Sequence, residues 1–165
     1  MPLVLVRVDC RLIHGQVIES WVPYTKADYL LVANDDLAND ELQQTIMKMA
    51  VPPTIKVEVS SVMDAARKLQ NGLENHRRVI LLVENCEDAL RCYRHGLKFN
   101  ALNLGNLVCT ESKRQVTCSI YLDDRDLECL REITQSGITV EARPVPDSHS
   151  TSLGQILVPV PRGLD

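Results

Sequence analysis

A short polar stretch near the start of the chain contains side chains that can handle a phosphoryl group. The imidazole of His14 is nucleophilic at neutral pH, and the planar guanidinium of Arg11 can hold two phosphoryl oxygens at once. Asp9 can accept a hydrogen bond from the other ring nitrogen and so fix the tautomer of the ring. Gly15 gives the backbone freedom and removes bulk beside the imidazole. These residue types predict a phosphoryl-carrying histidine; a structural or merely exposed histidine is the alternative.

The flanking patterns predict how this stretch is held. An apolar run at residues 3–8 indicates a strand, and the amphipathic run that begins at Val17 indicates a helix. His14 would then lie at the carboxyl end of the strand, where ligands bind in open α/β sheets. The start of the helix offers free amide groups and a partial positive charge, which favour an anion beside the ring. We therefore expect the ring to be presented to solvent rather than buried.

The sequence DCRLIHGQV at residues 9–17 resembles the signature of the IIB components in the mannose/fructose/sorbose family of the bacterial phosphoenolpyruvate-dependent phosphotransferase system. Further segments follow in the order and approximate spacing typical of that family, at residues 34–38, 50–53, 102–105 and 137–143. The resemblance covers roughly residues 3 to 146. The histidine loop is its most specific part.

This resemblance implies a cytoplasmic phosphocarrier, a protein-N(pi)-phosphohistidine-sugar phosphotransferase without metal or cofactor. His14 would take a phosphoryl group from a phosphohistidine on a IIA partner and pass it to sugar held by the membrane IIC and IID partners. Asp9 and Arg11 would assist as catalytic residues. The other residues expected in the phosphoryl-binding loop are Cys10, Leu12, Ile13, Gly15 and Gln16. The candidates for supporting that loop from neighbouring segments are Asn34, Asp35, Gly105 and Asn106.

Asn106 is a departure from the pattern, because the family usually carries two adjacent glycines where this chain has Gly105 and Asn106. Asparagine tolerates left-handed backbone conformations better than most residues, so the turn can persist. Its side chain works against the close approach of a phosphoryl group at this point.

Composition limits the class of protein. Hydrophobic residues make up 45% and charged residues 24% of the 165 residues, which is ordinary for a globular protein of one domain. The formal charge of -4 provides no general basic surface for nucleic acid. No apolar run is long enough to span a membrane, and the first residues lack the pattern of a signal peptide. We expect a cytoplasmic protein.

The cysteines could suggest disulfides or a zinc site. The chain has 6 cysteines but no C-x-x-C pair and no paired histidine spacing, so reduced thiols are the better interpretation. Cys10 is the exception, because Arg11 and the loop amides could lower its pKa and make it reactive.

The order of patterns predicts an α/β doubly wound, mostly parallel sheet with helices on both faces. The resemblance adds an antiparallel edge. Leu42, Ile46 and Met49 recur at helical spacing, and Asp35 or Asp36 is expected to cap that helix. The segments with strand patterns are residues 3–8, 27–33, 55–59, 79–83, 101–104, 116–122 and 138–142.

Composition changes after Arg143, where prolines flank a serine-rich segment and the apolar patch 156–158. We interpret residues 1–146 as the IIB domain and residues 147–165 as a Pro/Ser-containing tail. That tail is either disordered or packs its apolar patch on a neighbouring subunit, so a homo-oligomer is compatible with the sequence.

Two rival functions remain at this point. The chain could be a regulatory phosphohistidine signalling protein of the same family that is not coupled to transport, for which Asn106 and the tail are the reasons. A small-molecule phosphatase or binding protein on the same fold is the other. It lacks a second acid/base residue at convincing spacing and a glycine-rich phosphate loop.

Overall fold

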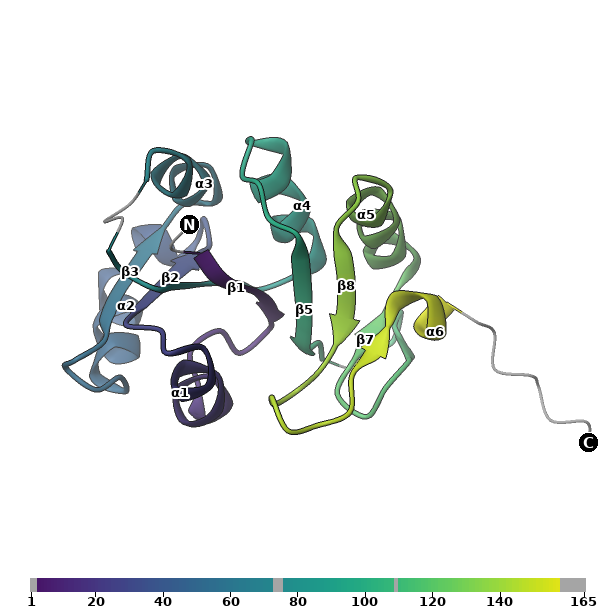
Figure 1. Ribbon diagram of the computed structural model, residues 1–165, viewed down its shortest axis with the longest axis horizontal. Coiled ribbons are helices and arrows are strands. Elements are labelled where there is room, and N and C mark those ends of the chain that lie inside the picture. The colour runs from purple at the N-terminus through teal and green to yellow at the C-terminus, as the bar shows by residue number, and fades with distance from the viewer. Residues whose placement is uncertain (1–2, 73–75, 109, 158–165) are drawn as a thin grey trace, which may run out of the picture.

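The computed structural model describes residues 3–72, 76–108 and 110–157. Its main feature is a twisted seven-stranded sheet with strand order β3-β2-β4-β1-β5-β8-β9. Figure 1 shows this sheet with helices on both of its faces. The strands are β1 (Leu3–Asp9), β2 (Tyr29–Ala33), β3 (Lys56–Ser60), β4 (Val79–Val83), β5 (Ala101–Asn106), β8 (Thr139–Ala142) and β9 (Thr151–Ser152).

All neighbouring strands are parallel except β9, which runs antiparallel to β8 at the edge. Every residue of β2 and β4 is buried. Both strands are continuously apolar because helices cover the two faces of a parallel sheet. The predicted fold class, with its antiparallel edge, is confirmed.

The helices divide between two apolar cores. One core joins the sheet to α3 (Val62–Gln70), α4 (Cys86–Arg94), α5 (Asp124–Gln135) and α6 (Leu153–Leu157). The other lies beneath η1 (Val17–Trp21), α1 (Val22–Thr25), η2 (Leu37–Asn39) and α2 (Glu41–Met49). None of the helices in the described ranges is long and apolar enough to cross a bilayer.

One strand prediction was wrong, whereas the helix predicted from Leu42, Ile46 and Met49 is present as α2. The exposed fractions of these three residues are 68%, 52% and 81%, so their face does not pack on the core. Residues 116–122 do not form a strand of the main sheet. They belong to a small antiparallel hairpin of β6 (Arg114–Gln115) and β7 (Tyr121–Leu122), which meets the chain after β5 through a bridge between Leu107 and Ile120.

The first part of the expected tail belongs to the packed fold. β9 pairs with β8, and Leu153 and Ile156 of α6 are buried in the larger core. Within the apolar patch, Ile156 thus packs on its own chain and Leu157 is exposed; Val158 and the rest of the tail lie outside the described residues.

Candidate phosphoryl-transfer site

The histidine loop connects the carboxyl end of β1 to the helical segment that contains η1. Residues 15 and 16 already have helical backbone, and the carbonyl of His14 accepts hydrogen bonds from the amides of Val17 and Ile18 at 3.0 and 3.1 Å. Leu12 anchors the loop: its side chain is buried in the core beneath α1, and its φ of 55° is left-handed. Such a conformation is strained for leucine, so the loop depends on the packing of this side chain.

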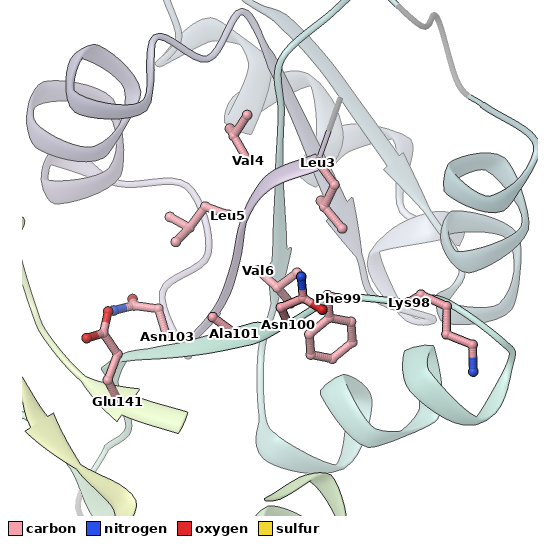
Figure 2. Close-up of a pocket in the computed structure, with 10 residues that line it drawn as sticks. All are labelled: Leu3, Val4, Leu5, Val6, Lys98, Phe99, Asn100, Ala101, Asn103 and Glu141. Atoms are coloured by element: carbon pink, nitrogen blue, oxygen red, sulfur yellow. The ribbon is translucent and has the colours of Figure 1, made fainter. Parts of the chain in front are cut away.

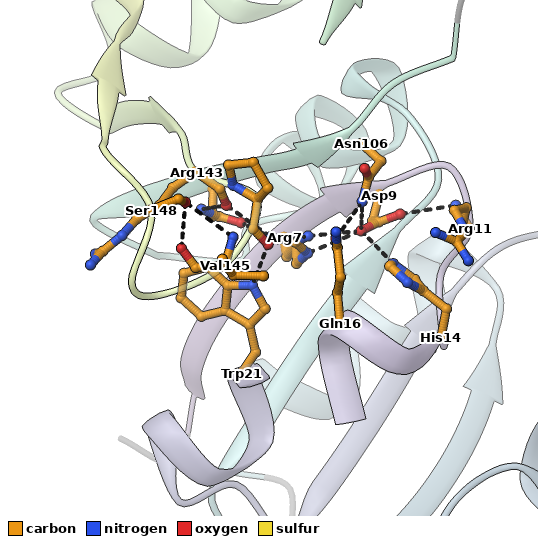
Figure 3. Close-up of polar contacts among 12 residues, drawn as sticks. Arg7, Asp9, Arg11, His14, Gln16, Trp21, Asn106, Arg143, Val145 and Ser148 are labelled. Atoms are coloured by element: carbon orange, nitrogen blue, oxygen red, sulfur yellow. Dashed lines mark hydrogen bonds and ion pairs between the residues drawn. The ribbon is translucent and has the colours of Figure 1, made fainter. Parts of the chain in front are cut away.

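The buried carboxylate of Asp9 is the centre of the site (Figure 3). Its Oδ2 atom accepts hydrogen bonds from Nη2 of Arg7 and Nδ2 of Asn106, both at 2.9 Å. The same oxygen lies 2.8 Å from Nε2 of His14. The other oxygen, Oδ1, accepts from the backbone amide of Arg11 at 3.0 Å. One carboxylate therefore joins β1, the loop and the end of β5.

The contact with Asp9 distinguishes the two nitrogens of the His14 ring. An ionised carboxylate can only accept hydrogen bonds, so Nε2 carries the hydrogen and Nδ1 of the neutral ring has the lone pair. Within the described ranges, Nδ1 is buried and has no hydrogen-bond partner. The His14 side chain is only 7% exposed. The expectation of a ring held out to solvent was wrong, because Asp9 draws the ring back toward the sheet.

Arg7 is the main site residue that sequence reasoning missed. Its side chain is fully buried, and its guanidinium binds Asp9 and the side-chain oxygen of Asn103 while it lies 5.3 Å from the centre of the Trp21 ring. Burial lowers the pKa of Arg7, and the charge of Asp9 acts in the opposite direction. The available signal was a charged residue within an apolar strand, since a buried charge needs a partner.

Arg7 also ties the site to the segment after β8. Its guanidinium donates to the carbonyls of Arg143 and Pro144 at 3.1 and 3.0 Å. The indole of Trp21 donates to the same Pro144 carbonyl at 2.9 Å. These hydrogen bonds therefore fix the helix after the histidine loop to the segment that follows β8, two strands from β1 in the sheet.

Gly105 and Asn106, at the end of β5, contribute to the site in different ways. The register of β1 against β5 pairs Asp9 with Asn106 and passes over Gly105. A Cβ atom on Gly105 would lie 2.1 Å from Cζ of Arg7, so the glycine makes room for the guanidinium. Asn106 does not have the left-handed backbone that the sequence suggested. Its side-chain amide instead donates to Asp9 and to Oε1 of Gln16, both at 2.9 Å.

The remaining loop residues differ in accessibility. Arg11 is exposed, and its guanidinium makes no hydrogen bond or ion pair within the described residues. The expected lowering of the Cys10 pKa was wrong, because burial and the charge of Asp9 raise the pKa of its thiol. Gly15 has no left-handed φ, so it is not needed for backbone freedom. A Cβ atom there would meet nothing within 4 Å, which leaves open space beside the loop.

Asn34 and Asp35 are not bonded to the histidine loop, because β4 lies between β1 and β2. Asn34 donates to Glu84 at 2.8 Å. Asp35 accepts from the amide of Val62 at 2.9 Å and pairs with Arg91 at 2.7 Å. These two groups lower the pKa of Asp35. The capping prediction was wrong: Asp40 caps α2, and Asp35 instead binds the first amide of α3, whose N-cap is Ser61.

A separate pocket of about 360 Å³ lies between the amino ends of β1 and β5 (Figure 2). Its lining includes Leu5, Asn103 and Glu141 but none of the histidine-loop residues. The polar groups of Asn103 bind Arg7 and the carbonyl of Arg143, and Glu141 accepts from Ser150 at 2.5 Å. This pocket is therefore distinct from the His14 site, which lies at the carboxyl ends of the strands.

Comparison with known proteins gives a consistent result. The family model described as the PTS system sorbose subfamily IIB component matches residues 3–160. The sorbose-specific EIIB component of Klebsiella pneumoniae is 33% identical over 153 residues, which cover 93% of each chain. The mannose-specific EIIAB component of Escherichia coli (strain K12) is 32% identical over 145 residues, which cover 88% of this chain and 45% of that protein. The crystal structure of the IIBSor domain of the Klebsiella pneumoniae sorbose permease has a TM-score of 0.87 at 34% identity, covering 94% of this chain and 96% of that chain.

Proposed function

The chain belongs to the sorbose-subfamily IIB components of the phosphotransferase system, and we propose that it is a phosphocarrier that holds a phosphoryl group on Nδ1 of His14. The observation that carries this proposal is the 2.8 Å contact between Asp9 and Nε2. It fixes the hydrogen on one ring nitrogen and leaves the lone pair on the other, which is the nucleophile. The corresponding activity is that of a protein-N(pi)-phosphohistidine-sugar phosphotransferase.

The transfer step exchanges one nitrogen–phosphorus bond for another. The lone pair of His14 Nδ1 attacks phosphorus in line, and the bond from phosphorus to the donor's imidazole nitrogen breaks. Its electron pair stays on the donor ring. The donor is a phosphohistidine on a IIA protein, which agrees with the name of the mannose-specific EIIAB relative. The transferred group carries charge on three oxygens in the transition state, so positioning and charge stabilisation supply most of the catalysis.

Two features of the loop are suited to that charge. Arg11 is exposed, and its guanidinium can hold two of the oxygens in a bidentate arrangement. The amides at the start of the helical segment after His14 point toward an incoming anion and add a partial positive charge. The Arg11 guanidinium and these amides together bind the phosphoryl group during transfer and leave Nδ1 of His14 free to attack.

Access to Nδ1 requires a movement, because this nitrogen is buried in the resting protein. Docking of the donor must turn the ring or displace part of loop 10–14. No atom fills the space beside Gly15, the residue directly after His14, within 4 Å of where a Cβ atom would lie. A carrier that shields its nucleophile in this way reacts with a docked protein in preference to small phosphate compounds.

After phosphorylation, we propose that the protein delivers the group to a sugar bound by membrane IIC and IID subunits on the cytoplasmic side. The decisive experiment is incubation with phosphoenolpyruvate, the general phosphotransfer proteins and a cognate IIA protein, followed by mass spectrometry of the modified peptide. We expect one acid-labile phosphoryl group on His14. His14→Ala should abolish it, and His149→Ala, a change at an exposed histidine outside the site, should leave it intact.

Arg11→Ala should slow the transfer while circular dichroism stays unchanged, because Arg11 is exposed and has no core role. A phosphoryl group on another residue would contradict the proposal. Sugar uptake in a deletion strain then separates a transport subunit from a purely regulatory phosphoprotein: loss of uptake is the expected result.

A further inference from the structure

The side-chain amide of Asn106 connects two groups on either side of the histidine loop. Its two hydrogens are both used: Nδ2 donates to Oδ2 of Asp9 and to Oε1 of Gln16, each at 2.9 Å. Figure 3 shows these contacts around the His14 ring. An amide nitrogen has two donors, so this arrangement satisfies both and fixes the rotamer of Asn106.

The backbone also holds Asn106 in place. Its carbonyl accepts a hydrogen bond from the amide of Cys10 at 2.9 Å, and the strand register sets it opposite Asp9. The glycine before it leaves room for the guanidinium of Arg7. Asn106 is therefore a fixed donor at the end of β5 rather than a flexible loop residue.

The contact with Asn106 determines which end of the Gln16 amide is available. The Asn106 amide nitrogen is a donor and therefore binds the oxygen of the Gln16 amide, Oε1. The Gln16 nitrogen, Nε2, keeps both of its hydrogens for other acceptors. Across the described ranges no acceptor binds Nε2, and Gln16 is half-buried two residues after His14. A neutral donor without an acceptor thus lies on the residue two positions after His14, in the network that reaches the ring through Asp9.

We propose that Asn106 is a positioning residue that orients Gln16, so that Nε2 of Gln16 donates a hydrogen bond to an oxygen of the phosphoryl group on His14. This rests on the proposed function. Without Asn106 the Gln16 amide can turn, and its oxygen would then repel the phosphoryl oxygens. Asn106 acts through Gln16, which in turn contacts the transferred group.

A double-mutant cycle tests this dependence. Asn106→Leu and Gln16→Met keep approximate volume and remove the polar atoms. Each should lower kcat for transfer from the phosphorylated IIA protein about tenfold, the loss that removal of one hydrogen bond to a charged group produces, with KM unchanged. The double variant should be no slower than Gln16→Met alone, because the proposal has Asn106 act through Gln16 and not through its bond to Asp9.

Gln16→Glu is the companion variant and keeps an oxygen to accept from Asn106. It places a carboxylate oxygen where Nε2 was, so transfer should be slower than in Gln16→Met. Thermal melting establishes that each variant is folded, and the Gln16 variants alone decide the donor role if Asn106→Leu does not fold.

Two outcomes would overturn this inference. If the losses from the two single variants multiply in the double variant, Asn106 acts through Asp9 and not through Gln16. If Gln16→Glu transfers at the wild-type rate, Gln16 donates nothing to the phosphoryl group. A wild-type protein without phosphate on His14 would instead contradict the proposed function, so the two failures are distinguishable.

Discussion

Two buried side chains of opposite charge, Arg7 and Asp9, lie on the same face of β1 beneath the histidine loop. Burial of charges is costly unless each has partners, and here each has several. The arrangement keeps an ionised carboxylate available to His14 in a position that solvent cannot reach. The pair therefore links the stability of the fold to the chemistry of the ring.

Arg7→Met should reduce the free energy of unfolding by about 3–5 kcal/mol, because it leaves the buried carboxylate of Asp9 without its main counter-charge. Urea denaturation at pH 7 measures this change. Arg11→Met is the matched control, since Arg11 is exposed, and it should change stability by less than about 0.5 kcal/mol. Equal effects of the two variants would contradict a structural role for the buried pair.

Gly105→Ala should lower stability by about 1–3 kcal/mol, the usual cost of overpacking. The new Cβ atom would lie 2.1 Å from the Arg7 guanidinium, which is held by four groups and cannot move freely. Gly15→Ala is the control, because a Cβ atom there meets nothing within 4 Å. Thermal melting compares the two. A neutral Gly105→Ala variant would show that Arg7 is not fixed.

The chemistry of the site could be predicted where the residues are close in sequence. Asp9 at the end of β1 and Arg11 and His14 in the loop after it are close in sequence, so their spacing alone brought them together, and the Asp9–His14 contact is present. Gly105 and Asn106 could not be connected to them in this way. Their contacts depend on the register of β1 against β5, which pairs residues about a hundred positions apart and passes over one glycine.

At the scale of elements, the ends of β2 and β4 are joined through side chains rather than through the histidine loop. Asp35 accepts from the first amide of α3 and pairs with Arg91, and both contacts favour its ionised form and lower its pKa. The stability from Asp35 is therefore fully present above the pKa of the unfolded chain, about 3.9. It is lost as pH falls through the lower pKa of the folded state.

Asp35→Asn should consequently be less stable than the wild type at pH 7, and the difference should shrink below about pH 4. Melting temperatures at pH 7, 5 and 3 measure this trend. Asp36→Asn provides the control, because Asp36 is exposed and its side chain makes no capping bond. A difference between Asp35→Asn and wild type that stays constant down to pH 3 would exclude the ionised carboxylate as its source.

Most elements could be predicted from local patterns. Ser61, Asn85 and Asp123 cap α3, α4 and α5, and all three are residue types that are favoured at helix N-caps. The failures have a common cause, because periodicity marks apolar faces but not what covers them. Residues 116–122 alternate like a strand, yet only Ile120 and Leu122 are buried there, and the segment turns back on itself.

At the scale of the whole molecule, the C-terminal segment completes the larger core. Leu153 is 4% exposed, so Leu153→Ala should cost about 2–5 kcal/mol through lost burial and the cavity left behind. Leu157→Ala should cost clearly less, because Leu157 is 36% exposed. Urea denaturation of both variants measures the difference. Similar small losses would mean that α6 packs loosely on the sheet.

The two-residue strand β9 has one more consequence, which concerns contact between copies of the folded chain. An open sheet edge offers a row of unpaired peptide groups, on which a second sheet can assemble. Because β9 is so short and leads directly into α6, it covers the margin of β8 and offers almost no ladder of its own. The geometry that closes the fold at β8 thus also discourages fibre growth from this edge of the sheet.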